Sequence, residues 1–328
     1  MQKVLVIGGA GYVGSQLVPA LLKSDFYVRV LDTFWYGSKH LEDLRDAKLE
    51  LVHADMRDVN KVSDALKGID VVIHLACISN DPSFDLDPKL GKSINLDSFR
   101  PIINLLNTSD VKRFIYASSS SVYGISEEER VTEELELTPL TDYSKFKAEC
   151  EQIQLNELRS DICSTVIRPA TVCGFSTRQR FDLVVNILTA SAIINREVRV
   201  FGGSQYRPNL HIEDMVQAYL CILNADSKVV DKEIFNVGSR NLTVREIAES
   251  VQSVIDIDIP IQFLETNDLR SYRVDSTKIL DRLEFAPKFT IEDAIQDLKL
   301  RFSQFDSVNP LVDSRYVNIL RMKELKLG

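Results

Sequence analysis

Short runs of apolar, mainly β-branched residues alternate with amphipathic segments along the first half of the chain. The apolar runs are KVLVI, YVRVL, LELVH, VVIHLA, RFIYAS and STVIRP. Between them, segments such as VGSQLVPALLKS and NKVSDALKG carry apolar residues at helical spacing. Strands that are apolar along their whole length are typical of a parallel sheet covered by helices on both faces. The pattern therefore predicts an α/β fold with a doubly wound parallel sheet of the Rossmann type.

The pattern becomes less regular after residue 175. LHIEDMVQAYLCIL and IFNVGS read as a helix and a strand that return to the first sheet, whereas TVREIAESVQSVI and IEDAIQDLKLRF read as amphipathic helices of a smaller lobe. We therefore expect a Rossmann domain over residues 1–175, with a return at about 208–239, and a smaller mixed lobe over residues 176–328. The last segment, from SQFDSV onward, either packs on the core or reaches a partner subunit.

A proline interrupts one helical pattern. Pro101 lies within SINLDSFRPIINLLN. Because proline lacks a backbone donor, we expect either a kink there or a helix that begins later than the pattern suggests.

Composition excludes several classes of protein. The chain has 328 residues and is 45% hydrophobic, which is enough for a sizeable core. No apolar stretch approaches the roughly 20 residues that cross a bilayer, and the N-terminus enters a strand without a signal-peptide pattern, so we expect a cytoplasmic protein. A net charge of -9 argues against a general nucleic-acid or membrane surface. The five cysteines are scattered without zinc-ligand spacing, so we predict reduced thiols and no metal site.

A glycine-rich turn follows the first predicted strand. In IGGAGYVG, the residues Gly8, Gly11 and Gly14 have G-x-x-G-x-x-G spacing. Such a turn lets a pyrophosphate approach the backbone at a helix N-terminus, where free N–H groups favour negative charge. The alternative is a plain glycine turn. Its position between a strand and a helix favours dinucleotide binding.

The ends of the next two strands supply carboxylates. Asp32 ends YVRVLD, 18 residues after Gly14, where a carboxylate accepts the ribose hydroxyls of adenosine and repels a 2′-phosphate. This position favours NAD over NADP, although a solvated strand-end residue or a helix cap is the simpler alternative. Asp55, in LVHADMRD, is a weaker candidate for a contact to the adenine.

A tyrosine and a lysine follow a run of four serines. Tyr143 and Lys147, in TDYSKFKAE, are four residues apart and hence on one face of a helix. Tyrosine is a poor base because its pKa is about 10, but a nearby ammonium and the positive nicotinamide ring of NAD both stabilise the phenolate. The pair therefore indicates a base that removes a hydroxyl proton while hydride leaves the same carbon. By itself, Y-x-x-x-K is also common on helix surfaces.

Taken together, these motifs resemble the extended short-chain dehydrogenase/reductase family, in its nucleotide-sugar epimerase and dehydratase branch. The resemblance covers nearly the whole chain and rests on IGGAGYVG, DMRD, HLAC, SSSSVYG, YSKFK, RPATVCG and RPNLHIED. It implies an NAD-binding first domain, a substrate-binding second lobe and a homodimer built from the helices that carry Tyr143 and Pro101. It further implies that NAD contacts Gly8, Gly11, Tyr12, Val13, Gly14, Asp32, Asp55, Met56, Leu75, Ala76, Tyr143, Lys147 and Pro169.

The resemblance also assigns roles within SSSSVYG. The active hydroxyl lies five residues before the glycine, which selects Ser119 as the group that hydrogen-bonds the reacting oxygen beside Tyr143. Ser118 is expected to be structural. Dehydratases of the family carry Asp-Glu where this chain has Ser120 and Ser121, so dehydration is disfavoured. Ser121 argues in the same direction, less decisively, against decarboxylation.

Softer assignments concern groups around the site. Asn95 matches a helix asparagine that helps to position the lysine, with a helix cap as the alternative, and His74 is expected to be structural. Arg207 matches a diphosphate ligand. In ETNDLRSYR, Asp268 is retained but Glu265 replaces a second arginine, so Arg270 or Arg273 is expected to substitute for it. Candidate residues on the segment that covers the sugar nucleotide are Arg178, Arg180 and Asn186.

Three functions remain compatible with these residues. The leading hypothesis is an NAD-dependent epimerase of a nucleoside-diphosphate sugar, acting at C4 through a transient keto-sugar. The alternative is a nucleotide-sugar dehydrogenase or keto-sugar reductase with net redox change, which needs the same serine, tyrosine and lysine. The third is a dinucleotide-binding sensor without activity. The sequence names neither the base nor the sugar.

Overall fold

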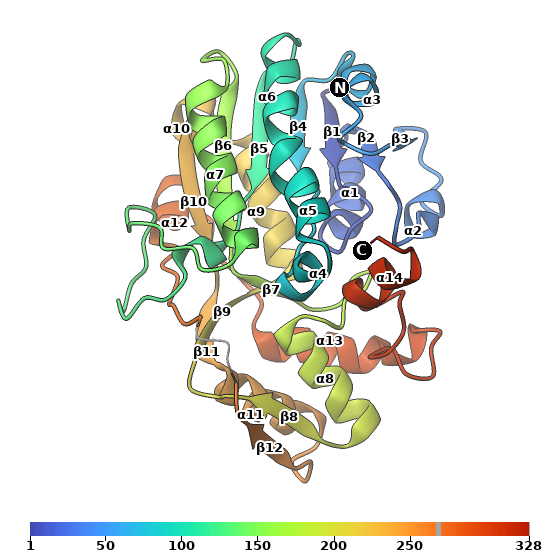
Figure 1. Ribbon diagram of the computed structural model, residues 1–328, viewed down its shortest axis with the longest axis vertical. Helices are drawn as coiled ribbons and strands as arrows, with labels where there is room; N and C mark the ends of the chain where they lie inside the picture. The colour runs from blue at the N-terminus through green and yellow to red at the C-terminus, as the bar shows by residue number, and fades with distance from the viewer. Residues whose placement is uncertain (267–269, 328) are drawn as a thin grey trace.

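A seven-stranded parallel sheet forms the centre of the larger lobe (Figure 1). The computed structural model describes residues 1–266 and 270–327. Strand order is β10-β6-β5-β4-β1-β2-β3, and every pairing is parallel. The strands are β1 (Lys3–Ile7), β2 (Tyr27–Asp32), β3 (Leu49–His53), β4 (Val71–His74), β5 (Arg113–Ala117), β6 (Cys163–Pro169) and β10 (Glu233–Val237). The predicted α/β fold with a doubly wound sheet is confirmed.

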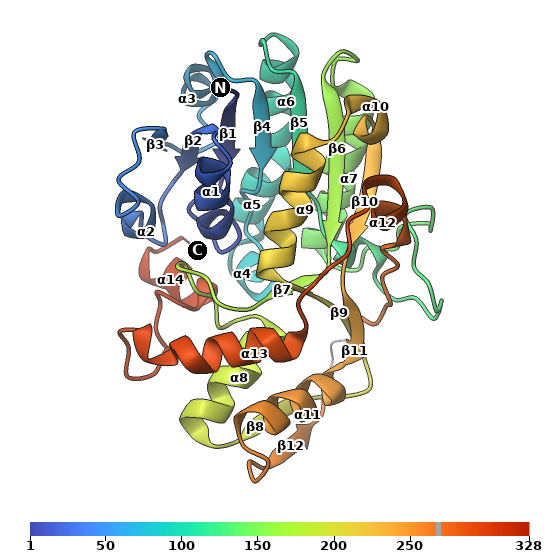
Figure 2. The same ribbon diagram turned by 180° about the vertical axis from the view of Figure 1, so that it is seen from behind.

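Helices cover both faces of this sheet (Figures 1 and 2). On one face, α1 (Gly14–Lys23) and α9 (Ile212–Asn224) bury Leu17, Leu21 and Tyr219 against the strands. On the other face lie α3 (Val59–Leu66), α6 (Phe99–Asn107) and α7 (Asp142–Glu157). Because both faces are buried, each central strand is apolar along its length, which explains the continuous runs in the sequence.

The smaller lobe is mixed in structure. Helices α8 (Val184–Asn195), α11 (Val244–Ile255) and α13 (Ile291–Arg301) pack on the two-stranded sheet of β8 (Val198–Phe201) and β12 (Ile261–Leu264). A three-stranded sheet of β7 (Thr171–Cys173), β9 (Tyr206–His211) and β11 (Arg240–Thr243) joins this lobe to the first. The remaining short helices are α2 (Lys39–Glu42), α4 (Asp81–Leu86), α5 (Pro88–Lys92), α10 (Ser227–Val230), α12 (Thr277–Leu283) and α14 (Asn318–Glu324). Two further short turns of 3₁₀ helix span Ser120–Tyr123 and Phe302–Gln304.

Pro101 lies in the first turn of α6, where its missing donor costs little. The preceding residues form a π-helix, Ser93–Asp97, so the regular α-helix begins only at Phe99. The later start is one of the two outcomes expected from the sequence. A π-helical turn at this place is a local irregularity of the kind often found beside functional sites.

The C-terminal segment packs on its own chain. In α14, which is red in Figure 1, Asn318 and Met322 are buried, and Met322 joins the apolar cluster under α3 and α6. Arg321 Nε donates to the carbonyl oxygen of Trp35 at 2.5 Å, so the segment also contacts the loop after β2. The sequence left open whether this segment packs on the core or reaches a partner subunit. In the structure it packs on the core.

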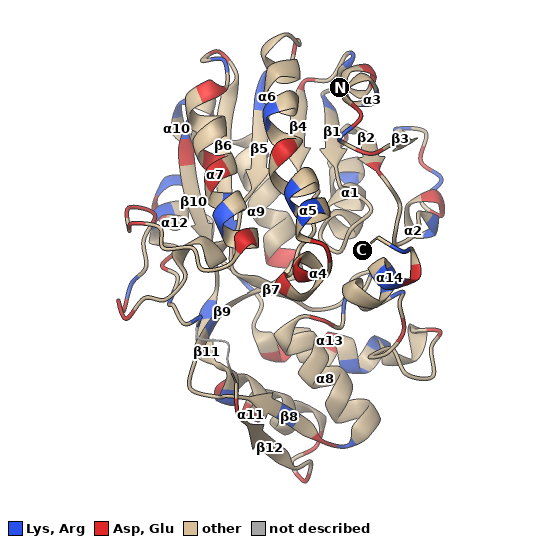
Figure 3. Cartoon of the chain, viewed as in Figure 1, with Lys and Arg blue, Asp and Glu red and all other residues tan. Residues whose placement is uncertain are grey.

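In Figure 3, α7 carries charges of both signs, whereas the charged residues of α5 and α6 are basic. Among the helices of the described ranges, none has the length and apolar character needed to span a membrane.

Candidate active site

One large cavity lies at the carboxyl ends of the parallel strands, the edge at which ligands bind in open α/β sheets. Its volume is about 1030 Å³, and its wall includes residues of both lobes. All thirteen residues expected to contact NAD line it, as do Ser119, Arg207 and Arg270 of the expected substrate ligands. The tertiary structure therefore brings residues from position 8 to position 270 to a single cavity.

The glycine turn after β1 shows two different reasons for glycine. A Cβ on Gly8, whose φ is +85°, would lie 2.5 Å from the backbone nitrogen of Ala76, and a Cβ on Gly14 would lie 2.4 Å from the carbonyl oxygen of Gly9. Those positions are required by the protein's own packing. A Cβ on Gly11 meets only the carbonyl oxygen of Gly8, at 3.5 Å, and Gly11 lines the cavity. Gly11 therefore keeps free a cradle into which a pyrophosphate fits.

This difference predicts two separable outcomes. Gly11→Ala is expected to leave the melting temperature of the ligand-free protein unchanged but to weaken NAD binding about 10- to 100-fold, because overpacking costs about 1–3 kcal/mol. Gly14→Ala is expected to lower the melting temperature as well. Calorimetric titration with NAD and thermal melts of both variants check this, and equal NAD affinity for Gly11→Ala and wild type would contradict it.

Asp32 presents a carboxylate to the same cavity. Its Oδ2 accepts a hydrogen bond from the backbone N–H of Ala10 at 3.0 Å, and its Oδ1 accepts one from Phe34 at 2.8 Å. Burial raises the pKa of Asp32, whereas these two bonds oppose the rise. Each oxygen keeps a lone pair for a ligand hydroxyl, which fits the ribose of a dinucleotide. Asp55, the candidate for adenine, lies on the wall but pairs with Arg57 at 2.6 Å.

Of the four consecutive serines, Ser119 is the one that is not buried. Ser118 donates to the carboxylate of Glu151, and Ser120 hydrogen-bonds Tyr272 at 3.3 Å. Ser121 donates its hydroxyl to Ser119 Oγ at 2.9 Å. All four serines line the cavity, and the internal hydrogen bonds of the other three leave Ser119 as the one that is partly exposed there.

Tyr143 and Lys147 are brought beside Ser119 by the first turns of α7. A capping box between Thr141 and Ser144 fixes the start of this helix. The Tyr143 phenol lies beside Ser119, which acts on its pKa as a hydrogen-bonding neighbour. Lys147 is buried, and its Nζ donates to the carbonyl oxygen of Ala117 at 2.6 Å while lying 6.0 Å from the Tyr143 ring centroid. The Ser119 hydroxyl, the Tyr143 phenol and the Lys147 ammonium thus lie in the same part of the cavity wall.

The pKa of Tyr143 differs from the expectation drawn from the sequence. Burial raises the pKa of this phenol, the thiolate form of Cys77 would raise it further, and the hydrogen bond from Ser119 lowers it. The protein's side chains alone therefore do not favour the phenolate, although Lys147 lies near the ring. A further positive charge beside the phenol is needed for it to ionise near neutral pH.

Two arginines line the substrate side of the cavity. Arg207 donates to the carbonyl oxygens of Tyr206, at 3.1 Å, and of Arg270. Arg270 pairs with Asp81. Arg273 instead stacks on the Tyr206 ring at 4.7 Å, so Arg270 is the better substitute for the missing arginine. Asp268 lies outside the described residues.

The assignment of Asn186 as a substrate ligand is corrected by the structure. Its side chain is 0% exposed. Oδ1 accepts the N–H of Gly174 at 3.0 Å, and Nδ2 donates to Arg180 O at 2.9 Å and to the Tyr12 hydroxyl at 3.1 Å. With its amide used internally, Asn186 ties the glycine turn to the chain after β7.

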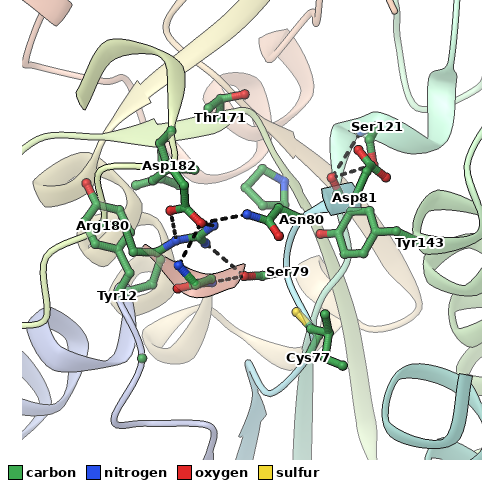
Figure 4. Close-up of a pocket in the computed structure, with 18 of the residues that line it drawn as sticks. Tyr12, Cys77, Ser79, Asn80, Asp81, Ser121, Tyr143, Thr171, Arg180 and Asp182 are labelled. Carbon is green, nitrogen blue, oxygen red and sulfur yellow. Dashed lines mark hydrogen bonds and ion pairs between the residues drawn. The ribbon is translucent and has the colours of Figure 1, made fainter. Parts of the chain in front are cut away.

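Arg178 and Arg180 are buried rather than solvated. Figure 4 shows Arg180 within a cluster that also contains Asp182, Asn80 and Ser79, with Tyr143 across the cavity. Arg180 pairs with Asp182 at 2.9 Å and donates to Ser79 Oγ at 2.9 Å. Sequence reasoning missed Ser79, Asn80 and Asp182, because no local pattern links them.

Asn95 and His74 support the site from behind. Asn95, in the π-helix, exchanges two hydrogen bonds with the backbone of Ile78, at 2.8 and 2.9 Å, and so fastens the chain after β4. Its amide is thus used by the backbone of Ile78 rather than by the start of a helix. His74 is buried among aromatic rings, and burial lowers its pKa to about 3, so it stays neutral.

A model of the NAD dependent epimerase/dehydratase family matches residues 4–238. The UDP-glucose 4-epimerase of Lactobacillus helveticus is 30% identical over 315 residues, which are 89% of this chain and 94% of that protein. This relative resembles the chain along both lobes.

Solved structures with the same fold include enzymes of two kinds. The UDP-glucuronic acid 4-epimerase of Bacillus cereus, in complex with UDP-glucuronic acid and NAD, superposes with a TM-score of 0.83 at 24% identity, covering 92% of this chain and 99% of that one. DesIV, a dTDP-glucose 4,6-dehydratase of Streptomyces venezuelae, also gives 0.83, at 21% identity, covering 94% and 100%. At these identities the likeness establishes the fold alone, which does not separate epimerase from dehydratase.

Proposed function

Because the chain belongs to the NAD-dependent epimerase/dehydratase family, we propose that it interconverts the C4 epimers of a UDP-sugar. The observation that carries this proposal is the geometry around Tyr143. Ser119, Tyr143 and Lys147 meet in the cavity wall shared by the expected cofactor and substrate residues. Such a set moves a proton at a sugar hydroxyl, and the relative at 30% identity is a UDP-glucose 4-epimerase.

The two serines that follow Ser119 favour epimerisation over loss of water. Elimination needs an acid and a base near the adjacent carbon. Here Ser120 hydrogen-bonds Tyr272, and Ser121 donates to Ser119. Neither has a carboxyl group, so this part of the wall offers hydrogen bonds but no proton transfer to a leaving hydroxyl.

The reaction that we propose uses the phenol as both base and acid. Tyr143 takes the proton of the C4 hydroxyl, Ser119 holds that oxygen by a hydrogen bond, and Lys147 stabilises the phenolate by its charge. NAD, held by Gly11, Asp32 and Lys147 in the cavity wall, would supply a positive charge and a reversible acceptor for the hydride of C4. The keto-sugar turns so that its other face is presented, and Tyr143 then returns the proton. No net oxidation results.

The substrate occupies the end of the cavity that belongs to the second lobe. Arg207 and Arg270 provide cations for its diphosphate, since guanidinium groups bind phosphate oxygens in pairs. Beyond them, Leu188, Val200 and Phe201 form an apolar wall suited to the face of a base. We accordingly assign cofactor binding to residues 1–175 with the return at 208–239, and mainly substrate binding to residues 176–328.

Assembly and location extend the same proposal. Helices α6 and α7 lie side by side on one face of the sheet, and we propose that they form a homodimer interface (Figure 1). We also propose a cytoplasmic location, where nucleotide sugars and NAD are both available. Light scattering after size exclusion tests the dimer, and a monomer at micromolar concentration would contradict it.

Incubation with NAD and UDP-sugars tests the activity. UDP-glucose, UDP-glucuronic acid and UDP-arabinose are each followed by proton NMR and by the absorbance of reduced NAD. An epimerase equilibrates two isomers without accumulating reduced cofactor, whereas the dehydrogenase alternative accumulates it in proportion to product. A 4-keto-6-deoxy product would mean that the serines do not prevent dehydration. Net reduction, dehydration or no turnover with any UDP-sugar would overturn the proposal.

A further inference from the structure

Arg178 is a buried cation that the reaction described above does not use. It follows β7, and its backbone N–H donates to Ser15 Oγ at the first turn of α1, at 3.3 Å. The guanidinium stacks on the ring of Tyr36 at 3.8 Å, and Nη2 donates to Asn318 Oδ1 at 2.6 Å. Its side chain is thus held by a residue of the loop after β2 and by the C-terminal helix.

Asp32 and Asp182 act on the charge of Arg178 from a distance, but neither carboxylate pairs with it directly. Among the described residues, none forms an ion pair with it, and its buried Nε lacks a hydrogen-bond partner. Arg180, two residues away, pairs with Asp182 at 2.9 Å. Burial and the neighbouring Arg180 lower the pKa of Arg178 to about 10. A buried, unpaired charge is costly, and the cost is removed when an anion binds beside it.

The position of Arg178 identifies the kind of anion. It lines the cavity together with Gly11 and Val13 of the glycine turn and Asp32. Its charge acts on Asp32, Tyr36 and His40 of the first lobe, and on Asp182, which already pairs with Arg180. The two arginines of the substrate side, Arg207 and Arg270, come from β9 and from the chain after β12. An anion next to Arg178 therefore belongs to the cofactor.

We propose that Arg178 is a further cofactor-binding residue, whose guanidinium binds the diphosphate of the dinucleotide and which Asn318 of the C-terminal helix positions. This inference rests on the proposed function, because it takes the ligand of the glycine turn to be NAD. The phosphates are then held by two separate parts of the chain. The glycine turn supplies backbone N–H groups, and Arg178 supplies a full charge.

The C-terminal segment acquires a role from this contact. Asn318 accepts from Arg178, donates to Ser79 Oγ at 3.3 Å, and its N–H reaches Asp182 at 3.3 Å. Arg321 bonds the carbonyl oxygen of Trp35, next to Tyr36. The segment therefore contributes Asn318, which binds the Arg178 guanidinium, and holds the loop that carries Tyr36, on which the guanidinium stacks. It positions a cofactor ligand without contacting the reacting atoms.

Arg178→Met tests the proposal through binding rather than turnover. Trp35 is the chain's single tryptophan and lines the cavity, so its fluorescence reports binding. We expect the Kd values of NAD and of ADP to rise about 10- to 100-fold, as for loss of a charge-assisted hydrogen bond, and the Kd of adenosine to stay unchanged. Because the removed charge is unpaired, the ligand-free melting temperature should not fall.

Arg273→Met is the matched control. Arg273 also stacks on a tyrosine ring and has a buried Nε without a partner, but it lies outside the cavity wall. Its NAD affinity should equal that of wild type. In Asn318→Asp a carboxylate takes the place of the amide that faces Arg178, so NAD binding should weaken because the arginine then has an internal partner.

Specific outcomes overturn the inference. They are an unchanged NAD affinity in Arg178→Met, an equal loss for adenosine and ADP, or a tighter complex in Asn318→Asp. If wild type fails to bind NAD, the proposed function fails with it. If wild type binds NAD and Arg178→Met binds it equally well, only the role of Arg178 is lost.

Discussion

Tyr143→Phe is expected to lower kcat for UDP-sugar epimerisation by about 10³-fold, within the range that a positioned general acid–base group contributes. The phenol lies beside Ser119, and its ring centroid is 6.0 Å from Lys147 Nζ. Phenylalanine keeps the ring and removes the one oxygen that can exchange the proton of the sugar hydroxyl. NAD affinity, measured by titration, should change by no more than about fivefold, since a single neutral hydrogen bond is worth about 1 kcal/mol.

Tyr116→Phe supplies the control for this experiment. Tyr116 also lies beside Lys147, with 4.8 Å between Nζ and its ring centroid, but it is buried in the core under α6 and α7. Removing its hydroxyl takes away a phenol near the lysine without touching the cavity. Its kcat should stay near the wild-type value. Comparable losses in the two variants, or substantial turnover in Tyr143→Phe, would show that Tyr143 is not the proton-transfer group.

Local spacing explains which parts of the fold and site were predictable. The strand runs, the glycine turn and the Tyr143–Lys147 pair are each defined within one or two turns of chain, so backbone geometry alone relates their residues. A helix start fixed by Thr141 and Ser144 then delivers Tyr143 to the cavity without help from distant residues. Local spacing does not distinguish Ser119 from the serines beside it, because their burial depends on distant partners such as Glu151 and Tyr272. Only the resemblance to the family singled it out.

Residues whose roles depend on distant contacts escaped prediction. Asn186 was assigned to the substrate from its segment, yet its amide is used by Gly174, Arg180 and Tyr12. The contact of Arg178 with Asn318 joins positions 140 residues apart, and no pattern in either segment reveals it. The raised pKa of Tyr143 arises from burial, which the spacing to Lys147 does not encode.

A buried ion pair under the active site predicts a large effect on stability. Glu151 is 0% exposed and pairs with Arg168 at 2.7 Å, and it also accepts the hydroxyl of Ser118. Arg168 reaches Tyr123 OH at 2.8 Å. The pair therefore joins α7, one turn beyond Lys147, to the ends of β5 and β6. Removing one partner leaves the other charge buried.

Glu151→Gln is accordingly expected to lower the free energy of unfolding by about 3–5 kcal/mol, because Arg168 keeps its charge without a counter-ion. Glu157→Gln, on the same helix, removes the exposed pair with Arg100 and should lower the stability far less, because solvent screens that pair. Denaturant unfolding measures both. The double variant Glu151→Gln/Arg168→Met should recover part of the loss, since it removes the stranded charge. If the losses of the two single variants, Glu151→Gln and Arg168→Met, simply added in the double variant, the loss in Glu151→Gln would come from packing. It would then not come from an uncompensated guanidinium.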